Sequence, residues 1–170
     1  MNASDHNNEM KNTDNDQQFL TFRLADQDYG IEILKVQEIK GWSQVTPLPN
    51  SPKYIKGVLN LRGTIVPVID LRLRFNLEEA EYDSFTVIMV VNVGGRLAGL
   101  VVDSVSDVIS MSDDQYCDTP EFEGQINRQF IGGLGQIGDK LFILLKAEKI
   151  VDEETLDAVS REELEPEAIS

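Results

Sequence analysis

The chain consists of short apolar runs separated by polar and glycine-rich segments, and this pattern favours strands over long helices. The most apolar runs, such as residues 57–61, 65–69, 85–93 and 96–102, are only five to nine residues long. Helical spacing is convincing only over residues 148–160, where four apolar residues could pack on a core: Ile150, Val151, Leu156 and Val159. Roughly nine or ten short strands with glycine-rich turns predict an all-β protein with a short C-terminal helix.

The expected strands divide between two halves of the chain. About five precede the acidic loop at residues 78–84 and about five follow it, enough for a small barrel in each half. We therefore expect one barrel over about residues 18–83 and a second over about 84–146, and the pattern leaves open whether strands are exchanged between them. Pro67 has no backbone N–H, so its strand is expected to lie at an edge or to carry a bulge there.

Both ends of the chain are polar and acidic. Residues 1–17 contain four acidic residues and one basic residue, and we expect a disordered tail there. Residues 147–170 contain nine acidic and two basic residues, and we expect a solvated acidic tail over 156–170. The net charge of −15 argues against nucleic acid or anionic lipid as the main partner.

The sequence also points to a compartment. A single cysteine, Cys117, excludes an internal disulfide framework and fits a reducing environment, so we expect a cytoplasmic protein. No window approaches the roughly 18 uninterrupted apolar residues of a membrane span, and residues 1–17 contain no apolar segment of a secretory signal. Direct membrane insertion is therefore not expected.

The reactive side chains do not form a recognisable catalytic set. His6 is the one histidine and lies in the polar tail, which argues against a nucleophilic triad and against a zinc site with the one cysteine. The acidic pairs Asp103/Asp107 and Asp113/Asp114 fit turns and strand ends better than a general acid/base pair. We expect a protein that is not an enzyme, with no catalytic residue, metal or cofactor.

One segment matches a nucleotide-binding pattern. Gly133-Leu-Gly135-Gln-Ile-Gly138 is a literal GxGxxG, which holds a pyrophosphate only where a helix begins on it. Here the apolar run 141–145 follows, and it predicts a strand. We interpret the three glycines as turn and bulge positions between strands.

Arg62 stands at the tip of the hairpin expected between residues 57–61 and 65–69. Its chemistry leaves two interpretations open. It is either a solvated turn arginine or a positioned donor beside a protein-binding groove, where arginine is over-represented.

Long segments of the chain resemble a known family. FLTFRLADQDYGIEILKVQEIKGW (19–42) and YIKGVLNLRGTIVPVIDLRLRF (54–75) are similar to the CheW family of bacterial chemotaxis coupling proteins, as are residues 91–111 and 130–150. The resemblance covers about residues 18–155. Its most specific motif is NLRGTIVPVIDLR.

This resemblance implies a fold and a function. The fold would be two five-stranded SH3-like barrels that share an apolar seam. The function would be that of a non-enzymatic adaptor, which joins the cytoplasmic hairpin tips of chemoreceptors (methyl-accepting chemotaxis proteins) to the regulatory domain of the histidine kinase CheA. Such an adaptor is cytoplasmic and is recruited to membrane-associated chemoreceptor arrays.

The resemblance also carries receptor-binding residues onto this chain: Val36, Glu38, Gly57 and Arg62, with Val87 and Val105 as weaker matches. It assigns no kinase-binding residue. Val36 and Glu38 are two apart in one expected strand and would share a face, which the hairpin bearing Gly57 and Arg62 would continue. Gly57 would then allow a partner to approach the backbone closely.

Two other function classes remain as alternatives. A hydrolase would use the carboxylates of one of the acidic pairs. An SH3-like module for a proline-rich peptide would need an aromatic groove, which one tryptophan and four tyrosines spread over the chain supply poorly.

Overall fold

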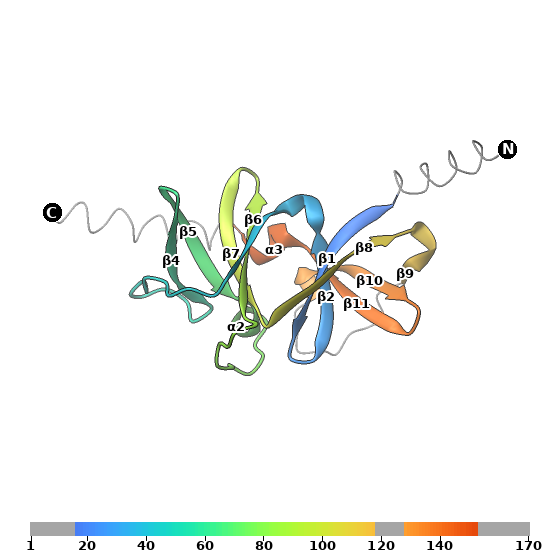
Figure 1. Ribbon diagram of the computed structural model, residues 1–170, viewed down its shortest axis with the longest axis horizontal. Coiled ribbons are helices and arrows are strands. Elements are labelled where there is room, and N and C mark those ends of the chain that lie inside the picture. The colour runs from blue at the N-terminus through green and yellow to red at the C-terminus, as the bar shows by residue number, and fades with distance from the viewer. Residues whose placement is uncertain (1–15, 118–127, 153–170) are drawn as a thin grey trace.

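The computed structural model describes residues 16–117 and 128–152, which form two sheets side by side along the long axis of the molecule (Figure 1). The first sheet has the strand order β8-β1-β2-β11-β10-β9. Its strands are β1 (Gln17–Leu24), β2 (Gln27–Glu32), β8 (Ser104–Met111), β9 (Tyr116–Cys117), β10 (Ile131–Ile137) and β11 (Lys140–Leu145). The second sheet has the order β3-β6-β7-β5-β4. Its strands are β3 (Val36–Gly41), β4 (Ile55–Leu61), β5 (Thr64–Asp70), β6 (Val87–Val93) and β7 (Arg96–Val102).

Helical segments in the described chain are single turns. They are η1 (Ile33–Lys35), α2 (Leu71–Arg74), η2 (Asp113–Gln115), η3 (Arg128–Phe130) and α3 (Ala147–Ile150). The Asp70 side chain accepts a hydrogen bond from the Leu73 N–H and so caps α2. Of the helix expected over residues 148–160, residues 148–150 lie in α3, which ends at Ile150, and the described residues Val151 and Asp152 are not helical. Ile150 and Val151 are buried. The expected tails at 1–17 and 156–170 lie outside the described residues, except for Asp16 and for Gln17, which belongs to β1.

The sheets divide the chain differently from the sequential partition expected at about residue 83. The chain makes β1 and β2 in the first sheet, then all five strands of the second sheet, and then returns to the first sheet at β8. Pairings between strands distant in the chain produce this order: the parallel pairs β2–β11 and β5–β7 and the antiparallel pairs β1–β8 and β3–β6. Because no tight turn joins the partners in these pairs, no local turn signal identifies them.

Three apolar cores hold this arrangement together. The largest lies along the seam between the sheets, where Phe22 and Ile31 of the first sheet belong to the same cluster as Met89 and Leu100 of the second. A separate cluster in the second sheet contains Val66, Ile88 and Val90 among others. A third, in the first sheet, contains Phe19, Met111, Phe142 and Leu144. The shared apolar seam expected between two β subdomains is therefore confirmed.

Pro67 was expected at an edge or at a bulge, but it lies in β5, an inner strand, in regular register with Val58 of β4. Both backbone groups of its partner Val58 bond to Thr46 on the other side of β4, at 2.8 and 2.9 Å. The ladder between β5 and β7 begins only at Val68. Neither neighbouring strand therefore requires an N–H from Pro67.

The GxGxxG segment is part of a hairpin between strands, as expected, but Gly135 lies in the regular ladder of β10 and not at a turn or bulge. Gly133 and Gly135 lie in β10, a register shift follows Ile131, and Gly138 has a φ of 61° in the turn to β11. A Cβ on Gly135 would stand 2.3 Å from the Met111 Cε, so this glycine makes room for the third core. β11 follows where a nucleotide site would need a helix.

Candidate partner-binding surface

Two edge strands border the seam, and each contains a β-bulge within the same sequence pattern, in which two polar residues separate two apolar ones. β3 reads Val36-Gln37-Glu38-Ile39, and β8 contains Val105-Ser106-Asp107-Val108. The register of β3 against β6 shifts between Val36 and Glu38, and that of β8 against β1 shifts between Val105 and Asp107. In a regular strand, residues three apart point to opposite faces. The extra residue of each bulge instead brings both apolar residues to one face.

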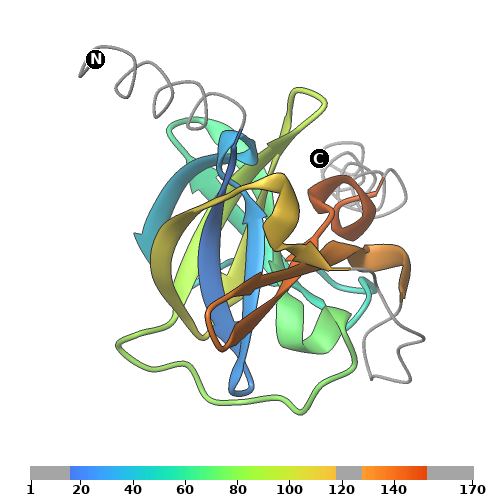
Figure 2. The same cartoon turned by 90° about the vertical axis from the view of Figure 1, so that its right-hand side faces the viewer.

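That face is the seam face of each sheet. In β3, Val36 lies opposite Val91 and Ile39 lies opposite Met89, and both partners are buried in the seam core. In β8, Val105 lies opposite Phe22 and Val108 opposite Leu20, which belong to the same core. Figures 1 and 2 place β3 and β8 on the same side of the molecule, at the front in Figure 1 and at the left in Figure 2.

These side chains are only partly covered. Ile39 is 44% exposed and Val108 is 46% exposed, whereas Val36 and Val105 are half-buried and pack on the seam core. Val87 of β6 is also half-buried and packs on the same core. We refer to these five residues, Val36, Ile39, Val87, Val105 and Val108, as the seam patch. It contains three of the residues that the sequence suggested and adds Ile39 and Val108.

The spacing of Val36 and Glu38 had suggested that the two side chains share a face, but they lie on opposite faces of β3. Because Gln37 is the extra residue of the bulge, Glu38 lies opposite Val90, which belongs to the core of the second sheet. Its carboxylate accepts a hydrogen bond from Arg62 in the turn between β4 and β5, with 2.7 Å between Glu38 Oε2 and Arg62 Nη2. Since β3 and β4 are the two edges of this sheet, the ion pair connects those edges.

Arg62 is therefore a partnered turn residue. It has a φ of 50° and the following Gly63 has a φ of 89°, and the Gly63 N–H donates to Asn60 Oδ1 at 2.8 Å. This geometry fixes the tip of the hairpin. The Arg62 side chain is 68% exposed, so its ion pair contributes at most about 1 kcal/mol to stability. Most of its guanidinium remains accessible to a partner.

Gly57 serves the fold of its own chain. It is buried in β4 with a φ of 150°, and a Cβ there would stand 2.1 Å from the carbonyl oxygen of Thr46. The close approach that this glycine permits is that of the segment leading into Pro47, because Thr46 pairs with Val58. The sequence had suggested that a partner protein approaches the backbone at Gly57, but the segment that does so belongs to the same chain. Gly57 does not belong to the seam patch.

The acidic pairs considered for hydrolysis have other partners. Asp103 accepts two hydrogen bonds from Arg72, at 2.6 and 2.8 Å, and Asp107 Oδ1 accepts from the Val108 N–H at 2.8 Å. Partial burial acts to raise the pKa of Asp103, but the hydrogen bonds from Arg72 and the Ala25 N–H outweigh it and leave that pKa below its usual value. Asp113 and Asp114 begin the η2 turn.

Two aromatic side chains outside the strands, Trp42 and Tyr82, pack beside the second sheet. The rings of Trp42 and Tyr82 are 4.2 Å apart between centroids and contact the core of that sheet. The Tyr82 hydroxyl donates to Asp70, and burial together with this carboxylate raises the pKa of Tyr82. Both rings are half-buried and are engaged with each other and with this core.

Among the described residues, no cluster of histidine, cysteine, aspartate or glutamate side chains is arranged to hold a metal ion. Across residues 16–117 and 128–152, no helix has the length and apolar character to cross a membrane.

Comparison with known proteins gives one consistent family. Residues 18–155 match the model of the CheW-like domain. The chain is 48% identical over 143 residues to the chemotaxis protein CheW of Klebsiella aerogenes, which covers 84% of this chain and 86% of that protein. It is 36% identical over 143 residues to the probable chemotaxis protein CheW of Rhizobium etli, with 84% and 92% covered.

A solved structure agrees with the fold. The crystal structure of the scaffolding protein TtCheW from Thermoanaerobacter tengcongensis matches with a TM-score of 0.76 and 31% identity, over 82% of this chain and 95% of that one. The sheets and the matched residues together show that the chain belongs to the CheW family of chemotaxis scaffold proteins.

Proposed function

We propose that this protein couples the cytoplasmic tips of chemoreceptors to the regulatory domain of the histidine kinase CheA, and that it works in the cytoplasm at membrane-associated receptor arrays. The observation that carries the proposal is the seam patch, in which a chain of a scaffold family leaves apolar side chains of both sheets partly uncovered. Such a surface fits a protein partner. We propose neither a nucleic acid nor a cofactor as a ligand of this protein.

The seam patch has the chemistry to receive a helical hairpin. Four of its five residues come from β3 and β8, edge strands of two different sheets, and Val87 comes from β6 beside β3, so a helix with an apolar stripe could contact both sheets at once. The Glu38–Arg62 pair lies at the edge of the second sheet and would supply polar contacts at the rim. Val87 and Val105 are less exposed and would form the buried side of the patch, whereas Ile39 and Val108 are more exposed and would contact the partner.

The test is a titration of purified variants against a receptor hairpin fragment and, separately, against the kinase regulatory domain. Val108→Asp places a carboxylate in an apolar contact that offers it no partner. We expect it to weaken receptor binding about 5- to 150-fold, the range of 1–3 kcal/mol typical of hot-spot residues. Val36→Asp should act in the same direction. Kinase affinity should change much less.

Leu141→Asp is the matched control. Leu141 is 45% exposed, nearly the same as Val108, but lies in β11 and not in the seam patch. Its substitution should leave receptor affinity unchanged. Normal receptor binding by the Val36 and Val108 variants would show that the surface is misplaced. A wild-type protein that cannot bind both partners together would contradict the adaptor function itself.

A further inference from the structure

Asp103 joins the two sheets both covalently and through its side chain. It is the single residue between β7 of the second sheet and β8 of the first. Its carboxylate accepts from Arg72 of α2, with Nε to Oδ1 at 2.8 Å and Nη2 to Oδ2 at 2.6 Å. Oδ2 also accepts from the Ala25 N–H, at 3.0 Å, in the turn between β1 and β2. Its own N–H donates to the Arg23 carbonyl oxygen, at 3.1 Å.

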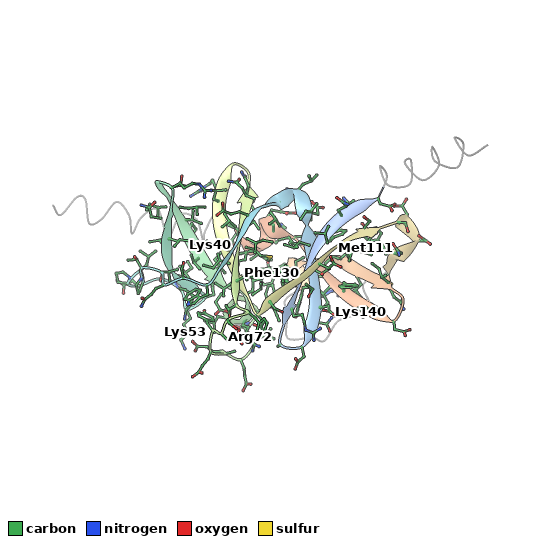
Figure 3. All side chains as sticks on the ribbon, in the orientation of Figure 1. Lys40, Lys53, Arg72, Met111, Phe130 and Lys140 are labelled. Atoms are coloured by element: carbon green, nitrogen blue, oxygen red, sulfur yellow. The ribbon has the colours of Figure 1, made fainter. Side chains whose placement is uncertain are left out.

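The geometry is that of a strong polar contact. The pair is bidentate, and the exposed fractions of the side chains are 19% for Arg72 and 32% for Asp103, so solvent screens it less than a surface pair. Arg72 is held from its other side, since its Nη1 donates to the Glu78 carbonyl oxygen at 3.1 Å. Figure 3 shows Arg72 in the lower part of the molecule, near α2 and the region where the sheets meet.

The Arg72–Asp103 contact lies close in the chain or in the sheet to seam-patch residues of both sheets. Val105 follows Asp103 by two residues in β8, and Val87 lies opposite Val102, the residue that precedes Asp103. The direction in which β8 leaves β7 therefore depends on how Asp103 is held. The other passage between the sheets that leads to the patch, η1, has no side-chain cap hydrogen bond.

We propose that Asp103, held between Arg72 and the Ala25 N–H, is a positioning residue that fixes the angle between the two sheets. It thereby sets the separation of the β3 and β8 parts of the seam patch. The expected effect on receptor binding rests on the proposed function, whereas the expected effect on the angle between the sheets does not.

A second contact should keep the protein folded when Asp103 is replaced. Arg74, also on α2, donates to the Ile150 carbonyl oxygen and to Asp152 Oδ2, both at 3.4 Å. Its guanidinium also lies over the rings of Tyr54 and Phe130, at 4.4 and 4.7 Å from their centroids. This contact involves α3, which lies opposite β3 and β8 in Figure 2. Loss of the Asp103 contact should therefore loosen the side of the molecule that carries the seam patch.

The experiment measures the separation directly in the full chain. Spin labels are attached at Gln37→Cys and Ser106→Cys, the two exposed bulge residues, with Cys117→Ser to remove the native thiol. Double electron–electron resonance should give one narrow distance distribution. Asp103→Asn should broaden or shift it, and Arg72→Gln, which removes the same ion pair from the other side, should do the same.

Asp28→Asn is the matched control. It removes the Arg23–Asp28 ion pair at 3.0 Å, which connects β1 and β2 within one sheet. The distance distribution should not change. An unchanged distribution in a folded Asp103→Asn or Arg72→Gln protein would overturn the proposal.

Binding supplies the second readout. Asp103→Asn should weaken affinity for the receptor hairpin fragment roughly 2- to 30-fold, the range for residues that act on a site without touching its ligand. Unchanged affinity despite an altered distance distribution would overturn the link to binding. If the wild-type chain does not bind the fragment at all, the proposed function fails, and the distance measurements still decide whether Asp103 sets the angle.

Discussion

At the scale of single residues, apolar, charged and glycine positions near the proposed surface differ in what they contribute. Ile39 and Val108 are exposed and available for contact, whereas Val36, Val87 and Val105 also support the seam core. Arg62 and Glu38 hold each other across the edges of the second sheet. Gly57 makes room for Thr46 and contributes to folding. A change that alters binding at Gly57 would therefore act through structure.

The role of Gly57 can be tested through stability. Gly57→Ala would combine an unfavourable φ of 150° with a Cβ at 2.1 Å from a backbone oxygen, and we expect it to lower the free energy of unfolding by at least about 1–3 kcal/mol. Gly41→Ala is the control, because a Cβ there meets nothing within 4 Å. Urea unfolding of both variants provides the measurement. Equal stability of the two would contradict this role.

At the scale of secondary structure, the sequence predicted most strands and missed what modifies them. Residues 57–61, 65–69 and 96–102 were expected as strands and lie in β4, β5 and β7. Alternation could not reveal the bulges, because it assumes one residue per position in each strand. The signal that could have revealed them is the spacing of Val36 to Ile39 and of Val105 to Val108, two apolar residues separated by two polar ones.

The bulge in β3 can be removed. Deleting Gln37 would give a regular register in which Val36, Glu38 and Ile39 keep their present partners and therefore their present faces. We expect the deletion variant to bind the receptor fragment normally, because the same apolar side chains remain on the seam face. Ile39→Asp, which keeps the bulge but places a carboxylate in the seam patch, should weaken receptor binding by about tenfold or more, on the scale of one lost hot-spot residue. A loss of affinity in the deletion variant, measured by the same titration, would show that the bulge itself has a part in binding.

At the scale of the whole molecule, the two subdomains and their seam followed from strand count and resemblance, but the assignment of strands to sheets did not. Turn signals connect neighbours in sequence, and they account for the hairpins β1–β2, β4–β5, β6–β7 and β10–β11. The pairings of β2 with β11 and of β5 with β7 join distant segments. These pairings form only when strands from the early and the late parts of the chain come together and bury the seam core.

This topology predicts how the chain behaves when it is cut at residue 83, where a sequential partition would separate two barrels. A fragment of residues 16–83 would lack β6 and β7 of the second sheet and all of β8–β11, and a fragment of residues 84–152 would lack β1–β5. Each would expose half of the seam core. We expect neither fragment to give dispersed amide resonances alone, and an equimolar mixture to recover them together with the circular dichroism of the intact chain. The intact chain cut after folding, at a protease site inserted next to residue 83, is the control and should remain native. Native dispersion from either fragment alone would contradict the sheet order, because an isolated half could then complete a sheet without strands from the other.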